Sequence, residues 1–154
     1  MNAIKIYRVA HCLHLKGIPV IPRLLKYTMF LLYNSIIPPE CDIGKGSYFG
    51  HRGIGVVLHP GAKIGARVLI GQGITVGGTM GAGPPTIGDD VWIGPGARIL
   101  GDISIGNNSV IGANAVVTKS FPANSVVGGV PARLLKTIGV GQLDTSSGTL
   151  QPLQ

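Results

Sequence analysis

Charged and aromatic side chains are scarce in this 154-residue chain, at 12% and 5% of the residues. An ordinary globular domain carries about 25% charged residues. The shortage does not indicate disorder, because hydrophobic residues make up 45% of the chain and the mean hydropathy is +0.40. The length suits one domain with an unusual, repetitive backbone.

Cysteine and long hydrophobic runs are also scarce. The two cysteines, Cys12 and Cys41, form no disulfide framework, and we expect both to be buried thiols in a reducing compartment. The apolar stretch over residues 27–37 is shorter than the roughly 20 residues that span a bilayer. No signal peptide is evident, so we expect a cytoplasmic protein.

Acidic residues are missing from the first 39 positions, which carry five Lys or Arg residues before the first acid, Glu40. This charge favours a solvated helical face and leaves open contact with the anionic inner face of a membrane. No basic or aromatic motif of the usual nucleic-acid-binding modules is present, so nucleic acid is not an expected partner.

Glycine is abundant, with 25 residues, and a large apolar residue recurs every six positions. Gly follows most of these positions, and a small residue often follows four places later. The thirteen positions are Ile37, Ile43, Phe49, Leu58, Ile64, Ile70, Val76, Ile87, Ile93, Ile99, Ile105, Ile111 and Val117.

A period of six matches neither the 3.6 of an α-helix nor the alternation of a simple strand. It matches a chain that bends every six residues, so that three hexads close one triangular coil and the large residue points inward. Stacked coils then pair their backbones in parallel. We predict an all-β fold, a parallel β-helix over residues 36–138.

The repeat is interrupted twice. Three extra residues lie between Phe49 and Leu58, and five between Val76 and Ile87. Extra residues in a solenoid leave the wall as loops, and loops on a rigid scaffold are where sites tend to lie. Residues 1–35 lack the repeat and show helical spacing, which predicts a helical hairpin that caps the first coil. Residues 139–154 are predicted to be a disordered tail.

The hexads, the Gly-His-Arg-Gly run at 50–53, the Gly-Gly-Thr run at 77–79 and the ending Val-Pro-Ala-Arg at 130–133 resemble the hexapeptide-repeat acyltransferases. Within that family the chain is most similar to the serine acetyltransferase-like and polysaccharide O-acetyltransferase group. The resemblance implies a left-handed β-helix and a homotrimer, with acetyl-CoA bound in the groove between two subunits. It also implies direct acetyl transfer to a hydroxyl, without a covalent enzyme intermediate or a metal.

His51 occupies the family's catalytic position, at the first break in the repeat. A neutral imidazole can take the proton of an attacking hydroxyl at neutral pH. The alternative is a loop histidine that only packs. His59 is a weaker candidate because it directly follows a wall position, and His11 and His14 fall in the helical segment.

The same resemblance assigns cofactor-binding positions. Gly78 lies in the run that lines the acetyl end, where a backbone N–H could stabilise the thioester oxygen; otherwise it is only a corner residue. Five further positions match the end of the prism that binds the cofactor in this family, where cations suit its phosphates. The alternative is that they form only a solvated basic rim. These positions are Ala113, Thr118, Lys119, Arg133 and Lys136.

Three departures from the serine acetyltransferases concern the acceptor. No acid occurs at residues 34–37, where the family places an Asp that orients the imidazole. Gly50 replaces an Asp before the histidine, and Gly83-Pro84 stands where an Arg-His pair is expected. A zwitterionic amino acid needs paired charges. We therefore expect a saccharide or saccharide precursor as acceptor, with serine as the alternative.

Two other classes share this kind of prism. The γ-type carbonic anhydrases need three histidine ligands, and only His51 and His59 lie on the prism. A non-enzymatic β-helix scaffold would need neither the loop histidine nor the Arg133 ending. Both are weaker interpretations than an acetyltransferase.

Overall fold

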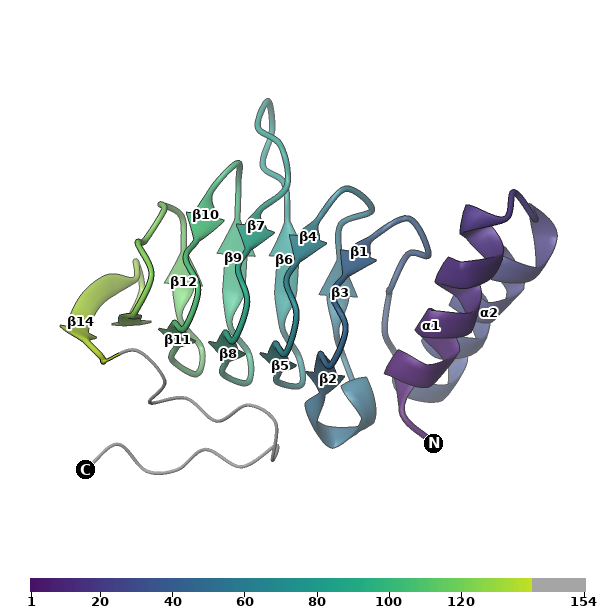
Figure 1. Ribbon diagram of the computed structural model, residues 1–154, viewed down its shortest axis with the longest axis horizontal. Helices are drawn as coiled ribbons and strands as arrows, with labels where there is room; N and C mark the ends of the chain where they lie inside the picture. Colours follow the sequence, from purple (N-terminus) through teal and green to yellow (C-terminus); the bar gives the residue numbers. More distant parts are fainter. Residues whose placement is uncertain (140–154) are drawn as a thin grey trace.

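The chain folds into a three-sided solenoid with two helices across one end (Figure 1). The computed structural model describes residues 1–139, so only Gly139 of the predicted tail lies within the described residues. The left-handed parallel β-helix expected from the repeat is confirmed.

Each side of the prism is one sheet in which strands pair in parallel, apart from the last strand. The first sheet holds β1 (Asp42–Ile43), β4 (Lys63–Ile64), β7 (Thr86–Ile87) and β10 (Ser104–Ile105). The second holds β2 (Tyr48–Phe49), β5 (Leu69–Ile70), β8 (Trp92–Ile93), β11 (Val110–Ile111), β13 (Ser125–Gly128) and β14 (Arg133–Thr137). The third holds β3 (Val57–Leu58), β6 (Thr75–Gly77), β9 (Arg98–Leu100) and β12 (Val116–Val117).

The register explains the two breaks in the repeat. Along the first sheet Ile43 pairs with Ile64, Ile64 with Ile87, and Ile87 with Ile105, at sequence separations of 21, 23 and 18 residues. Eighteen residues are three hexads, so the first two coils carry three and five extra residues, and these leave the wall. All thirteen hexad positions are buried, with at most 3% of their surface exposed. The interior is therefore a stack of aliphatic rungs with one aromatic residue, Phe49.

Close contact between coils explains much of the glycine content. A Cβ on Gly94 would lie 2.5 Å from the Ala113 nitrogen, and one on Gly71 would lie 2.7 Å from the Pro95 nitrogen. Backbone atoms cannot move aside as a flexible side chain can. The corners between the second and third sheets therefore stack too tightly for any side chain at these positions.

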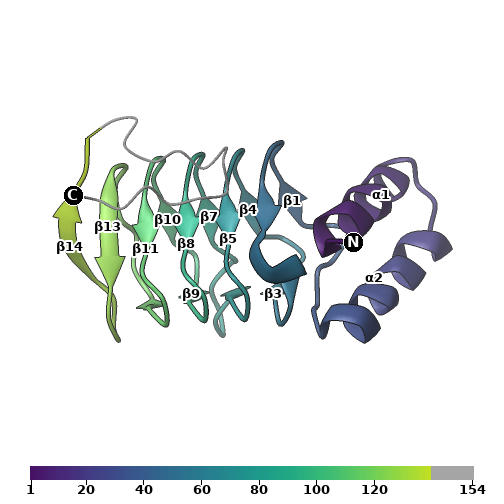
Figure 2. The same cartoon turned by 90° about the horizontal axis from the view of Figure 1, so that it is seen from below.

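Two helices, α1 (Ala3–Leu15) and α2 (Val20–Tyr33), form a hairpin across the end of the first coil (Figure 2). The Tyr7 hydroxyl donates to the Cys41 carbonyl, and the Arg8 guanidinium donates to the carbonyls of Ile43 and Gly44. Burial raises the pKa of the Tyr7 hydroxyl, so it stays a donor at every physiological pH. The hairpin thus satisfies polar groups that the first coil would otherwise leave open.

The expectation that both cysteines are buried was wrong for Cys12. Cys41 is buried beneath the cap, whereas Cys12 lies exposed on the outer face of α1. In a helix, residues a few positions apart face different directions, and Ile4, Tyr7 and Ala10 form the buried side here.

At the other end the prism is closed by its own chain. Strand β14 turns back and pairs antiparallel with β13. Phe121 pairs with Ile105 in an isolated bridge and covers β10. The segment around residues 129–132 covers β12: the Gly129 carbonyl accepts from Val116 N–H, and Ala132 N–H donates to the Val116 carbonyl. The first and third sheets therefore end against another segment, and the second ends in the antiparallel strand β14.

Two glycine substitutions test the tight stacking. Gly73 has φ +66°, and a Cβ at this position would have no atom within 4 Å, so Gly73→Ala should cost roughly 1–2 kcal/mol for its left-handed backbone alone. Gly94→Ala should lower the thermal unfolding midpoint further, because its methyl meets backbone atoms. Circular dichroism melts at one protein concentration would measure both. Equal midpoints, or a lower one for Gly73→Ala, would contradict the stacking argument.

Candidate functional site

The first break in the repeat forms a tight turn, η1 (Gly50–Gly53), between β2 and β3. His51 (φ 46°) and Arg52 (φ 64°) both have left-handed backbone conformations, and both side chains are exposed. Such φ values are uncommon for residues other than glycine and cost on the order of 1–3 kcal/mol each. The turn must therefore be held in place by its surroundings.

The helical cap supplies that hold. The Asn2 side chain caps α1 by accepting from Ile4 N–H at 3.1 Å and donates to the Phe49 carbonyl at 2.8 Å, directly before the turn. Gly53 packs under the start of α1, where a Cβ would lie 3.1 Å from the Ala3 Cβ. The entry to the turn is thus fixed to the first residues of the chain.

Ser35 fixes the other side of the turn. It is fully buried between α2 and the first coil, and its hydroxyl accepts from Val56 N–H at 3.1 Å. The same hydroxyl lies within hydrogen-bond distance of the carbonyls of Gly53 and Tyr33. Ser35 lies in the segment where the resemblance places an orienting acid, but it contacts the backbone of the turn rather than the imidazole.

The second break forms a loop over residues 78–85 that projects beyond the sheets between β6 and β7 (Figure 1). Thr79 and Ala82 close it with an antiparallel bridge, and Met80 at its tip is fully exposed. Gly78 is half-buried at its base, where a Cβ would lie 3.1 Å from the Ala82 carbonyl oxygen. Neither loop contains an acidic residue.

The structure divides the predicted site residues between two edges of the third sheet. His51 and Ala113 lie at corners between the second and third sheets, separated by three strand spacings of about 4.8 Å each. Gly78, Thr118 and Lys119 lie at corners between the third and first sheets. A single prism therefore does not place His51 and Gly78 on the same edge.

The cationic positions also separate. The Lys119 amine lies 5.5 Å from the centre of the Phe121 ring, which is a cation–π contact. Arg133 and Lys136 are exposed on β14, at the end of the prism opposite the helical cap. Arg133 and Lys136 therefore place exposed positive charge at the end of the prism away from His51.

Two of the remaining histidines, His59 and His11, have structural contacts. The His59 ring accepts from Gly61 N–H at 3.0 Å at a corner of the wall. His11 stacks on Tyr7 at 5.4 Å, with its Nδ1 lying 2.7 Å from the Pro39 carbonyl oxygen, and His14 is exposed. In contrast, the His51 imidazole has no hydrogen-bond partner within residues 1–139, so a bound substrate can reach it.

Neither the buried thiol of Cys41 nor a cluster of metal ligands offers a reactive site in the part of the chain that the structure describes. Burial, with the nearby Asp42 and Glu40 carboxylates, raises the pKa of the Cys41 thiol to about 12, so it stays protonated and unreactive. Within residues 1–139 no three His, Cys, Asp or Glu side chains converge as a metal site would require.

Sequence reasoning missed two residues of the site. Arg52 directly follows His51 and adds a cation, which forms no ion pair with any residue from 1 to 139. Its signal was its place in the first break of the repeat. Ser35 gave no signal, because its role depends on the packing of α2 against the turn.

Known proteins resemble this chain along most of its length. Residues 84–119 match the bacterial transferase hexapeptide family model, which describes six repeats. A serine acetyltransferase of Synechococcus elongatus is 42% identical over 142 residues, covering 90% of this chain and 58% of its own. One from Helicobacter pylori is 38% identical, covering 88% of this chain and 80% of its own.

The solved structures agree. The serine acetyltransferase of Brucella abortus in complex with coenzyme A has a TM-score of 0.84 and 36% identity, over 89% of this chain and 56% of its own. The chain thus spans a little over half the length of the cyanobacterial relative and of this structure. These relatives are named for serine, whereas the sequence led us to expect a saccharide acceptor for this chain.

Two serines provide a matched test of how the turn is held. Ser35→Ala leaves the buried Val56 N–H without its acceptor, which costs about 1–3 kcal/mol. Ser47→Ala removes the equivalent hydroxyl one corner away, between Val68 N–H and the Gly65 carbonyl. Hydrogen exchange should accelerate at residues 50–56 in the first variant and at 65–68 in the second. Unchanged exchange at 50–56 in Ser35→Ala would show that Ser35 does not hold the turn.

Proposed function

This chain belongs to the serine acetyltransferase family of hexapeptide-repeat transferases, and on that premise we propose that it transfers the acetyl group of acetyl-CoA to a hydroxyl, with His51 as general base. The observation that carries the proposal is the His51 turn. Its backbone is strained and held in place by the cap, and its imidazole is exposed and has no hydrogen-bond partner among the described residues. Such strain persists only where the surroundings impose it.

The reaction follows from these groups. The neutral His51 imidazole takes the acceptor's proton as its oxygen attacks the thioester carbonyl. The carbonyl oxygen gains negative charge, and the Gly78 N–H is the proposed donor to it. Collapse of the tetrahedral intermediate breaks the carbon–sulfur bond, and the imidazolium returns the proton to the departing thiolate.

We propose further that the active site forms between copies of the chain, in a homotrimer. His51 and Gly78 lie on opposite edges of the third sheet, so a second prism has to bring its other edge to the first. Coenzyme A would then extend along this groove from His51 past Ala113. Arg133 and Lys136 would hold its phosphates, because both are exposed cations at the far end.

For the acceptor, the relatives' names support L-serine. Arg52 offers a cation for the serine carboxylate, directly beside the general base. A saccharide hydroxyl is the second candidate. One observation favours it: neither loop carries a carboxylate for the serine ammonium group. The Asp102 carboxylate, which belongs to a different corner, lies beside the second loop, with its carbon 3.6 Å from the Cβ position of Gly83.

Replacing the general base tests the activity. His51→Ala should lower kcat/KM by about a hundredfold or more, as expected for removing a general base. Release of free thiol from acetyl-CoA measures the rate. His59→Ala is the matched control and should retain the wild-type rate, because that imidazole only caps a corner. A His51→Ala enzyme within a few-fold of wild type would refute this role.

A second assay separates the acceptors. L-Serine and a set of neutral sugars should be compared with the wild type and with Arg52→Gln. If serine is the acceptor, Arg52→Gln should raise the KM for serine by about tenfold or more, the cost of one charge-assisted hydrogen bond. If only a sugar is acetylated, and with an unchanged KM in Arg52→Gln, the saccharide hypothesis replaces the serine hypothesis.

A further inference from the structure

The outward side of α2 is apolar and has no partner within residues 1–139. Leu31 is 81% exposed, Tyr27 64%, Val20 61% and Leu24 58%. The spacing of these four residues is i, i+4, i+7 and i+11, which places them on one stripe of the helix. We call it the outer stripe. The opposite side, with Pro22, Met29 and Tyr33, is buried against α1 and the prism.

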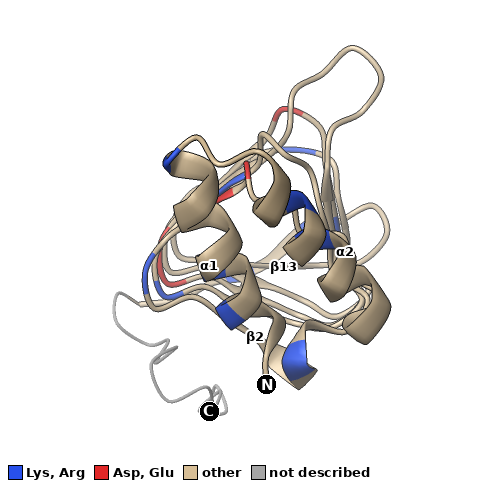
Figure 3. Cartoon of the chain, turned by 90° about the vertical axis from the view of Figure 1, so that its right-hand side faces the viewer, with Lys and Arg blue, Asp and Glu red and all other residues tan. Residues whose placement is uncertain are grey.

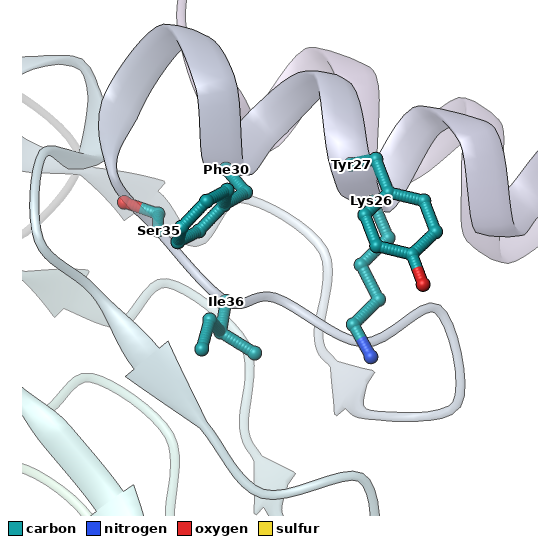
Figure 4. A pocket seen from close by; sticks show the side chains of 5 residues that line it. All are labelled: Lys26, Tyr27, Phe30, Ser35 and Ile36. Carbon is teal, nitrogen blue, oxygen red and sulfur yellow. The ribbon is translucent and has the colours of Figure 1, made fainter.

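Apolar surface continues from the outer stripe toward the prism. A groove of about 330 Å³ lies between α2 and the entry to the first coil. Figure 4 shows Phe30 and Ile36 pointing into the same space, with the Lys26 and Tyr27 side chains side by side and their polar ends pointing the same way. The groove therefore has apolar walls and a rim that carries one amine and one hydroxyl.

The cap around this surface is cationic. Lys5, Lys16, Arg23 and Lys26 lie on the two helices or directly after them, and no acid precedes Glu40. Figure 3 looks onto this end and shows Lys and Arg on both helices, with Asp or Glu on neither. Within residues 1–139 only Arg67 forms ion pairs, so no carboxylate directly contacts a cation of the cap. Among these residues, Glu40 is the acid that lines a pocket together with cap residues, beside Arg23.

We propose that the outer stripe docks on an anionic lipid surface, with α2 lying in the plane of the membrane. Apolar side chains flanked by Lys and Arg, without acids, are the composition of helices that bind the interface of anionic bilayers. No helix among the described residues has the length and apolarity to cross a membrane. A second copy of the cap fits less well, because it would bring like charges together with no acid between them.

Docking would also place the site near the lipid. Ser35 lines the groove and also holds the His51 turn. The turn is therefore fixed to the element that contacts the membrane. This consequence depends on the proposed function, whereas the docking itself does not.

Vesicle co-sedimentation tests the proposal with the full chain. The probes are vesicles of phosphatidylglycerol mixed with phosphatidylcholine, and vesicles of phosphatidylcholine alone. The protein should sediment with the anionic vesicles, and less at high salt. Leu24→Ser/Leu31→Ser should weaken the partition coefficient by about tenfold or more, because binding scales with buried apolar area. Both residues are exposed, so circular dichroism should stay unchanged.

Matched controls separate the cap from the rest of the surface. Lys16→Gln/Arg23→Gln should weaken binding, whereas Lys45→Gln/Lys63→Gln removes the same charge from the prism and should not. Leu134→Ser, on the opposite end, should also bind normally.

No sedimentation with anionic vesicles, or an equal loss of binding in the cap and prism variants, would overturn the proposal. A wild-type protein that, without lipid, forms a larger oligomer than the Leu24→Ser/Leu31→Ser variant would also overturn it. The outer stripe would then bind a second copy of the chain instead of lipid. Thiol release by the same variants shows separately whether catalysis survives.

Discussion

The spacing between successive coils, about 4.8 Å for paired strands, is the constraint on which the rest of this structure depends. At that distance the corner positions of Gly71 and Gly94 admit no side chain, because a Cβ there would meet backbone atoms of the next coil. Residues beyond three hexads per coil cannot stay in the wall. They leave it as loops at the edges of the third sheet, and those edges carry His51 and Gly78, to which we assign the chemistry.

The helical cap does more than cover the first coil. Asn2 and Ser35 come from the two ends of the hairpin, and they hold the two sides of one four-residue turn. His51 keeps a left-handed backbone because both sides are fixed. The stability of the cap and the geometry of the His51 turn are therefore coupled, and a substitution in the helices can act on the turn without touching it.

The sequence was sufficient for the prism and for the position of the loops, because a period of six has few structural solutions. All thirteen hexad positions are buried, and both breaks became loops. Roles that depend on packing across the chain could not be predicted. Ser35 acts through a turn 18 residues away, and Cys12 faces outward because tertiary contacts chose the other side of α1. The acceptor was the weakest inference, since it was argued from charges that are absent from the loops.

Parallel strands leave an unpaired ladder at each end of a solenoid, and such edges can template fibre growth. Here the cap closes one end, and β14, Phe121 and the segment at Gly129 close the other. The solenoid is therefore a stack of similar coils that is closed at both ends. Its length can change only by inserting or removing whole coils of three hexads, with or without a loop, between the two closures. Any such change would shift the cations on β14 relative to His51 by one strand spacing per coil, and with them the length of coenzyme that the proposed groove could hold.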